Sequence, residues 1–177
     1  MIPSTSQVGA AGAHRMPIEL RSPAVSDAAA MWRIVDSTPE LDTNSPYAYL
    51  LVCSHFSSTS LVAEDPGTGD LAGFVASYRL PDDPDVLFVW QVAVHPGRRR
   101  QSIGLRMLAG LLRQAGNRGV RHVQATVTPS NLASGRLFRS FAAVVGAPCA
   151  TTEQYHADLF PEGGHEAEVA YRIGPIP

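Results

Sequence analysis

The sequence predicts an α/β fold whose central sheet has mixed strand directions. Short runs rich in β-branched and aromatic residues alternate with segments whose apolar residues recur at helical spacing. Residues 86–94 are apolar on both faces of a strand, which is typical of a central strand covered on both sides. The turn at 65–67 separates two further strand-like runs and predicts a hairpin, so the sheet should contain antiparallel pairs.

Each expected element has a local signal. Apolar residues keep helical spacing from Pro23 to Val35, and Ile103, Met107 and Leu111 recur at intervals of four residues. In chain order, the expected elements are a strand at 18–20, helices at 22–35 and 47–56, strands at 60–64, 71–79 and 86–94, a helix from 103 to about 116, a strand at 122–128, a helix at 131–145 and a strand at 169–173.

The length and composition fit one folded domain. The chain has 177 residues, 45% of them hydrophobic and 17% charged, which is ordinary for a globular protein. Residues 1–15 are rich in Ser, Gly and Ala without an apolar signal core, so we expect a disordered tail there. Residues 16–177 are expected to form a single domain.

Several classes of function are excluded by composition. The net charge of −2 is too small for a surface that binds polyanions. All 14 basic residues are Arg, so a catalytic lysine or a Schiff base is excluded. The two cysteines, Cys53 and Cys149, match no metal or redox spacing, and no metal site is expected. No apolar run approaches the ~20 residues that span a bilayer, so a cytoplasmic protein is expected.

A basic loop follows the central strand and opens the next helix. Such a turn directs unpaired backbone N–H groups and the positive end of the helix dipole at one point. This geometry favours the binding of a pyrophosphate group. Small residues at Ser102 and Gly104 would let phosphate oxygens approach the backbone. The candidate cofactor-binding residues of this segment are Val92, Val94, Arg99, Arg100, Ser102, Ile103 and Gly104. The alternative is a solvated basic loop with no ligand.

A second strand-to-helix junction lies at residues 128–138. Asn131 and Ser134 at the start of its helix are further candidates for cofactor contacts, and the alternative for Asn131 is a helix N-cap. The two roles are compatible.

These two segments resemble the GNAT acetyltransferase superfamily. Arg99 to Gly104 matches its Arg/Gln-x-x-Gly-x-Gly/Ala motif, with Ser102 in place of the first glycine and Arg100 at a position that is commonly Gly. A serine with φ > 0 would be strained. The segment from Asn131 matches an Asn-x-x-Ala-x-x-Leu-Tyr pattern, but Phe138 stands where the family places a proton-donating tyrosine. The resemblance implies a mixed, mostly antiparallel central sheet flanked by helices, and acetyl-CoA as cosubstrate.

A narrower resemblance covers nearly the whole chain after Met16. Five blocks, at 41–49, 88–94, 125–131, 146–149 and 165–169, resemble signatures of the diaminobutyrate acetyltransferases. This resemblance implies a homodimer that transfers the acetyl group of acetyl-CoA to the γ-amino group of L-2,4-diaminobutyrate. The product would be the precursor of ectoine, a compatible solute of osmotic stress.

The blocks provide candidates for a site that binds this doubly cationic amino acid. Only a neutral amine attacks a thioester, so a base must lie near one nitrogen, and Glu168, His165 and Asp42 are the candidates. Gln91 stands where some family members keep a Glu base, and we expect Trp90 and Gln91 on opposite faces of their strand. The candidate substrate-binding residues are Asp42, Asn44, Tyr47, Trp90, Gln91 and Glu166.

Each candidate also has a purely structural alternative. Asp42 is a common turn former, Trp90 fits a core, and His165, Glu166 and Glu168 fit a solvated loop. Direct attack is expected, with the oxyanion near a backbone N–H such as that of Val92 or Val94. Two other functions stay open: acetylation of another small diamine or amino acid, and a CoA-binding sensor without turnover.

Overall fold

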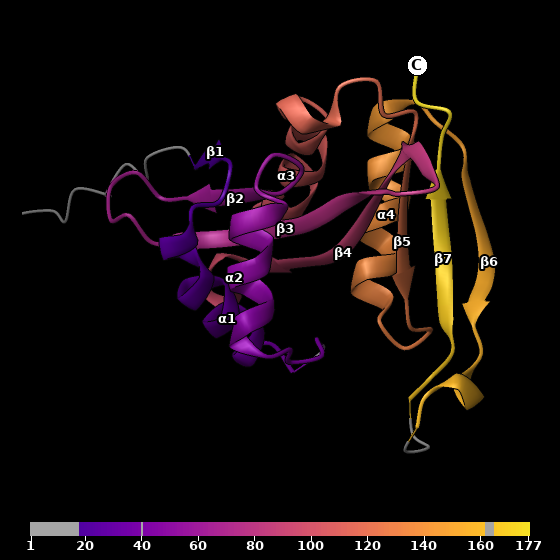
Figure 1. Cartoon of the computed structure of the whole chain (residues 1–177), viewed down its shortest axis with the longest axis horizontal. Helices are drawn as coiled ribbons and strands as arrows, with labels where there is room; N and C mark the ends of the chain where they lie inside the picture. Colours follow the sequence, from indigo (N-terminus) through magenta and orange to yellow (C-terminus); the bar gives the residue numbers. More distant parts are fainter. Residues whose placement is uncertain (1–17, 40, 162–164) are drawn as a thin grey trace, which may run out of the picture.

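The computed structural model describes residues 18–39, 41–161 and 165–177, so the tail expected at 1–15 lies outside the described residues. The elements follow one another in an order close to the predicted one (Figure 1). They are β1 (Glu19–Arg21), α1 (Ala28–Asp36), α2 (Pro46–His55), β2 (Leu61–Glu64), β3 (Leu71–Leu80), β4 (Asp83–Val94), α3 (Ile103–Leu111), β5 (His122–Val127), α4 (Leu132–Val145), β6 (Cys149–Tyr155) and β7 (Glu168–Ile173), with short 3-10 turns between some of them.

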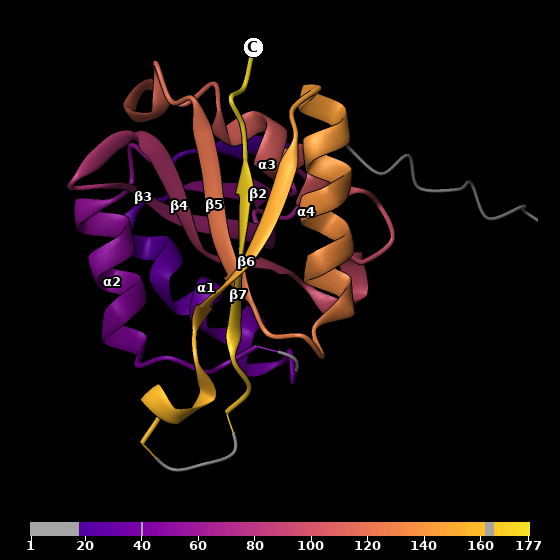
Figure 2. The same ribbon diagram turned by 90° about the vertical axis from the view of Figure 1, so that its right-hand side faces the viewer.

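Within the described residues, seven strands form one sheet in the order β1-β2-β3-β4-β5-β7-β6. Strands β4 and β5 pair in parallel, and every other neighbouring pair is antiparallel. The predicted mixed, mostly antiparallel sheet is therefore confirmed, as is the predicted hairpin of β2 and β3. Helices α1 and α2 lie on one side of the strands, and α3 and α4 lie on the other (Figure 2).

Strand β4 is central because it contributes to a hydrophobic core on each face of the sheet. On one face, Leu87 and Val89 of β4 pack in a buried cluster with residues of α3 and α4. On the other face, Ala93 of β4 belongs to a cluster formed with α1 and α2. The C-terminal half of β4 is thus held from both sides, as the apolar run at 86–94 predicted.

The sequence pattern missed strand β6. Its residues are mostly polar and exposed, because β6 is an edge strand whose one neighbour among the described strands is β7. An edge strand with both faces open to solvent has no apolar alternation to reveal it. The strand forms by antiparallel pairing with β7, from Cys149 opposite Ile173 to Tyr155 opposite Glu168.

Helix α3 is shorter than predicted, ending at Leu111 instead of about residue 116. The buried side chain of Asn117 donates a hydrogen bond from Nδ2 to the carbonyl oxygen of Leu111, at 2.8 Å. This bond satisfies one of the last carbonyl groups of the helix at the point where the helix ends. None of the helices in the described ranges is long and apolar enough to cross a membrane.

Candidate active site

The candidate site lies where β4 and β5 separate. Their parallel pairing ends with Val89 opposite Ala125, although both strands continue beyond that point. A cavity of about 210 Å³ lies in the gap, and residues 89–92 and 125–128 form two of its walls. The divergence of two central strands therefore creates a cleft in the middle of the sheet.

A β-bulge shapes one wall of this cavity. The register between β3 and β4 shifts at Trp90, which is left without a cross-strand partner. As a result, the Trp90 ring and the Gln91 amide both contact Tyr49 of α2: the ring centroids are 6.3 Å apart, and the Tyr49 hydroxyl donates to Gln91 Oε1 at 2.9 Å. The expectation that Trp90 and Gln91 lie on opposite faces was wrong, because the bulge interrupts the alternation.

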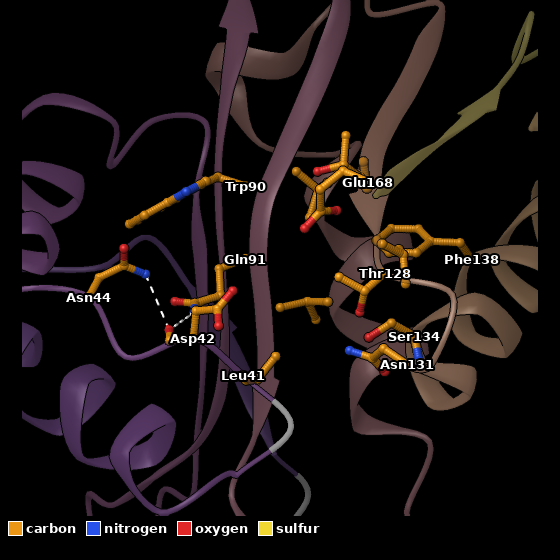
Figure 3. Close-up of a pocket in the computed structure, with 15 residues that line it drawn as sticks. Leu41, Asp42, Asn44, Trp90, Gln91, Thr128, Asn131, Ser134, Phe138 and Glu168 are labelled. Carbon is orange, nitrogen blue, oxygen red and sulfur yellow. Dashed lines mark hydrogen bonds between the residues drawn. The ribbon is translucent and has the colours of Figure 1, made fainter. Parts of the chain in front are cut away.

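Two acidic residues lie on opposite walls of the cavity. Figure 3 shows Asp42 with Asn44 and Gln91 on one wall, and Glu168 on the other. The Asp42 side chain is 86% exposed, whereas that of Glu168 is 16% exposed. The structure thus brings together two carboxylates that are 126 positions apart in the chain.

Glu168 is the more buried of the two acids. Its Oε2 atom is buried and has no hydrogen-bond partner among the residues that the structure describes. Burial raises the pKa of Glu168, and the negative charges of Asp42 and Glu166 add to this, while Thr126 and His165 oppose it. A buried acceptor without a partner is unfavourable, so this oxygen is suited to a ligand that donates a proton or a positive charge.

His165 lies between the two carboxylates. Its Nε2 is 3.6 Å from Asp42 Oδ2 and 3.9 Å from Glu168 Oε1. Its ring stacks on Phe160 at 3.8 Å, and its Nδ1 lies 2.7 Å from the carbonyl oxygen of Glu166. That carbonyl oxygen, followed by the charges of Asp42 and Glu168, raises the pKa of His165, with desolvation opposing. The imidazole therefore lies within 4 Å of two carboxylates at the edge of the cavity, and both of them favour its protonated form.

A second cavity of about 170 Å³ continues the first along β4. The two cavities share Leu41, Val92, Asn131 and Ser134 as lining residues, so they form one continuous cleft. The far end of the second cavity is lined by Val94 and Arg99, where the loop toward α3 begins. The cleft therefore joins the acidic end to the basic loop.

The basic loop adopts a strained conformation. Arg100 and Ser102 have φ values of 61° and 55°, in the left-handed region that favours glycine. Ser102 is the N-cap of α3 but makes no side-chain capping bond. The first N–H groups of α3 are therefore left for another acceptor, as a pyrophosphate site requires.

The absence of a side chain at Gly104 has a packing role that the sequence did not reveal. A Cβ atom at this position would lie 3.3 Å from Leu137, so Gly104 allows α3 to pack closely on α4. Ile103 is buried in the core beneath it, at 2% exposure. Gly104 and Ile103 thus anchor the start of α3, next to the basic loop, by packing against α4 and the core.

Asn131 is the N-cap of α4, which confirms the helix N-cap that the sequence analysis gave as its alternative role. Its side chain accepts a hydrogen bond from the backbone N–H of Ser134 at 3.0 Å, while both residues also line the cleft. Phe138 belongs to the core, with 2% exposure and its ring centroid 6.1 Å from that of Tyr171, and it also lines the first cavity.

The remaining candidates lie away from the cleft. Tyr47 is 64% exposed and does not line either cavity. Glu166 accepts hydrogen bonds from the backbone N–H and the hydroxyl of Ser130, and so ties the β6–β7 connection to the β5–α4 loop. Thr126 and Thr128 line the cavity and were missed, because which β5 side chains face the gap depends on the register with β4.

No three His, Cys, Asp or Glu side chains in the described ranges are placed to share a metal ion. The cleft combines a basic, N–H-rich end with an acidic end that holds one buried carboxylate of raised pKa. This combination suits a ligand with a phosphate-bearing part and a cationic part, and a carboxylate of raised pKa is able to accept a proton.

Comparison with known proteins agrees with this chemistry. The acetyltransferase (GNAT) family model matches residues 27–142. A protein of Streptomyces coelicolor named L-2,4-diaminobutyric acid acetyltransferase is 44% identical over 90% of this chain and 94% of its own length. A protein of the same name from Bordetella parapertussis is 45% identical over 89% of this chain and 84% of its own.

Solved structures give the same result. The diaminobutyrate acetyltransferase EctA from Paenibacillus lautus, in complex with L-2,4-diaminobutyric acid and coenzyme A, is 42% identical with a TM-score of 0.86, over 90% of this chain and 96% of that one. The ribosomal-protein-S18-alanine N-acetyltransferase from Escherichia coli is 20% identical with a TM-score of 0.66, over 90% of this chain and 94% of its own, and shares the fold. The chain therefore belongs to the GNAT acetyltransferase family and, within it, to the diaminobutyrate acetyltransferases.

Proposed function

We propose that this protein transfers the acetyl group of acetyl-CoA to the γ-amino group of L-2,4-diaminobutyrate, which yields the acetylated precursor of ectoine. The observation that supports this most directly is the partly buried carboxylate of Glu168, with an unpartnered oxygen and a raised pKa, opposite Asp42 in the cleft. A substrate with two amino groups matches two acids on opposite walls. A general base is most effective when its pKa approaches the working pH, and burial moves the pKa of Glu168 in that direction.

The residues of the cleft fit a CoA carrier. The uncapped start of α3 and the residues Arg99, Arg100 and Ser102 would hold the pyrophosphate, and Val92, Val94, Asn131 and Ser134 would line the path of the pantetheine arm. When bound, acetyl-CoA supplies the activated acetyl group as a thioester. Such a carrier would reach the acidic end through the gap between β4 and β5, where the two cavities adjoin.

The protein's own groups act on the amino acid. Glu168 accepts a proton from the γ-ammonium, because only the neutral amine is a nucleophile. Asp42 pairs with the α-ammonium, and the exposed edge of Trp90 packs on the aliphatic chain between the two nitrogens. Recognition of the α-amino acid end leaves the γ-nitrogen at the reacting position, which is catalysis by positioning.

The direct test is release of free thiol from acetyl-CoA with and without L-2,4-diaminobutyrate, followed by NMR of the product. We expect thiol release that depends on diaminobutyrate, and acetylation at the γ-nitrogen. L-Ornithine, which is one methylene longer, should react more slowly. Mainly α-acetylated product, faster reaction with another diamine, or CoA binding without turnover would each contradict the proposal.

We also propose that the protein works as a cytoplasmic homodimer. Helix α2 presents Tyr47 and Leu50 to solvent at 64% and 39% exposure, which is an apolar surface suited to a second copy. Cys53 and Cys149 are both free thiols, as expected in a reducing compartment. Light scattering should give twice the 18.9 kDa mass of the chain, and a monomer at micromolar concentration would contradict the dimer.

A further inference from the structure

Residues 41–45, here called the substrate loop, carry Asp42 and Asn44 to the cavity without regular secondary structure. Within the part of the chain that the structure describes, two side chains from other elements hold this loop at its carbonyl groups. Trp32 of α1 donates from Nε1 to the carbonyl oxygen of Asn44 at 3.2 Å. Gln91 of β4 donates from Nε2 to the carbonyl oxygen of Asp42 at 3.3 Å.

The orientation of the Gln91 amide is set from the other side by Tyr49. The Tyr49 side chain is fully buried, and its hydroxyl donates to Gln91 Oε1 at 2.9 Å. Burial is the main cause that raises the pKa of Tyr49, so the hydroxyl keeps its proton and remains a donor. With its oxygen toward Tyr49, the amide can only present its NH₂ group to the loop.

An amide is the side chain that this position requires. An ionised glutamate at 91 would still accept from Tyr49, but it would place a second oxygen against the carbonyl of Asp42. The Gln91 side chain is 9% exposed, so water would only partly relieve that repulsion. Both bonds of Gln91 are thus used to join α2, β4 and the substrate loop.

We propose that Gln91 is a positioning residue that fixes the substrate loop, and with it the Asp42 carboxylate, at the mouth of the cleft. Gln91 acts through Asp42 instead of contacting the reacting nitrogen. This inference rests on the proposed function for its kinetic consequences, but the contacts that carry it are internal to the protein. It also explains why the position that holds a glutamate base in some acetyltransferases holds an amide here.

The decisive variant is Gln91→Met, which keeps the length of the side chain and removes both hydrogen bonds without adding charge. We expect the KM for diaminobutyrate to rise about tenfold, with kcat changed less than threefold and the KM for acetyl-CoA unchanged. Gln124→Met is the matched control, since Gln124 is a half-buried glutamine of β5 that lies outside the cavity and accepts a bond from Arg172. It should leave all three constants unchanged.

A double-mutant cycle separates positioning from direct contact. If Gln91 acts through Asp42, Gln91→Met should add no further rise in KM to the Asp42→Asn variant. An equal rise in both backgrounds would overturn the proposal. Gln91→Glu provides a second check, because a gain in kcat would mean that position 91 lies beside the reacting amine and would also overturn it.

Amide hydrogen exchange tests the same idea without any substrate. Gln91→Met should speed exchange of the backbone N–H groups in residues 41–45, and Gln124→Met should not. Unchanged exchange in Gln91→Met would overturn the positioning role even if diaminobutyrate is the substrate. If the wild-type protein fails to acetylate diaminobutyrate while the exchange result holds, only the proposed function fails.

Discussion

The two ends of the cleft are built in different ways. The basic end comes from one continuous segment, residues 92–104, in which the end of β4 turns into α3. The acidic end comes from side chains of three separate segments, namely the substrate loop, the bulge of β4 and the start of β7. The basic end thus depends mainly on backbone geometry, whereas the acidic end depends on contacts between distant side chains. Substitutions should therefore affect them very differently.

The largest effect is expected from Glu168→Gln at the acidic end. The amide keeps the shape of the side chain but cannot accept a proton from the substrate ammonium, so kcat should fall at least about a hundredfold. The Kd for CoA, measured by calorimetry, should stay within about twofold because the basic end is untouched. Glu153→Gln is the matched control, since Glu153 lies on β6 and pairs with His156 at the surface.

The same variant should be more stable than the wild type. Glu168 is 16% exposed with an unpartnered oxygen, and its pKa is raised by burial, so its ionised form is less favourable in the folded state than in the unfolded chain. This destabilisation is absent at low pH and appears as the pH rises through the raised pKa. Thermal unfolding at pH 8 should therefore show a higher Tm for Glu168→Gln, and a clearly lower Tm would contradict a strained carboxylate.

Asp42→Asn should have a smaller effect of a different kind. The Asp42 carboxylate is 86% exposed, and in the proposed reaction it would hold the substrate without taking its proton. We expect the KM for diaminobutyrate to rise about tenfold while kcat changes less than threefold. Asp36→Asn, at the exposed end of α1, is the control. A large fall in kcat would instead make Asp42 the base.

The sequence predicted the basic end more fully than the acidic one, for a physical reason. Its loop residues are neighbours in the chain, so their motif and the N-cap role of Asn131 were both visible. Asp42 and Glu168 were named as candidates through matched blocks, but only the folded sheet shows that they line the same cavity. The bulge at Trp90, the edge strand β6 and the two bonds of Gln91 depend on register and on distant partners, which no local pattern contains.

The pH dependence of kcat/KM compares how Asp42 and His165, both at the acidic end, influence Glu168. The base form of Glu168 exists only above its pKa, so kcat/KM for diaminobutyrate should fall as the pH falls through that value. The charge of Asp42 raises the pKa of Glu168, and the charge of His165 lowers it. The acid limb of the profile should therefore move to lower pH in Asp42→Asn and to higher pH in His165→Gln, with several-fold rate differences on the limb.

Titration of the free substrate is the same for all three proteins, so differences between their profiles report on the enzyme alone. Profiles measured from about pH 5 to pH 9 in one buffer series would reveal the order of the three limbs. Coincident limbs would mean that neither Asp42 nor His165 is electrically coupled to the catalytic base.

The smallest effect is expected at the basic end, from Ser102→Gly. Ser102 has a φ of 55°, and the left-handed conformation costs an L-residue about 1–2 kcal/mol. Glycine removes this strain, but it also raises the conformational entropy of the unfolded chain, which offsets about 0.4–1 kcal/mol of the gain in stability. The net stabilisation of about 0.5–1 kcal/mol corresponds to a rise in Tm of about 2 °C for a chain of this size.

Ser102→Ala distinguishes this explanation from a role of the hydroxyl group. Alanine keeps the Cβ atom and its strain, and Ser102 makes no side-chain capping bond that alanine would remove, so its Tm should match the wild type. The Kd for CoA should change less than about threefold in either variant, because the N–H groups that would meet the pyrophosphate belong to the backbone. If alanine and glycine stabilise equally, strain at Ser102 is not what sets the stability of this loop. If both variants lose CoA binding, the hydroxyl group itself holds the cofactor, and the basic end depends on side chains as much as the acidic end does.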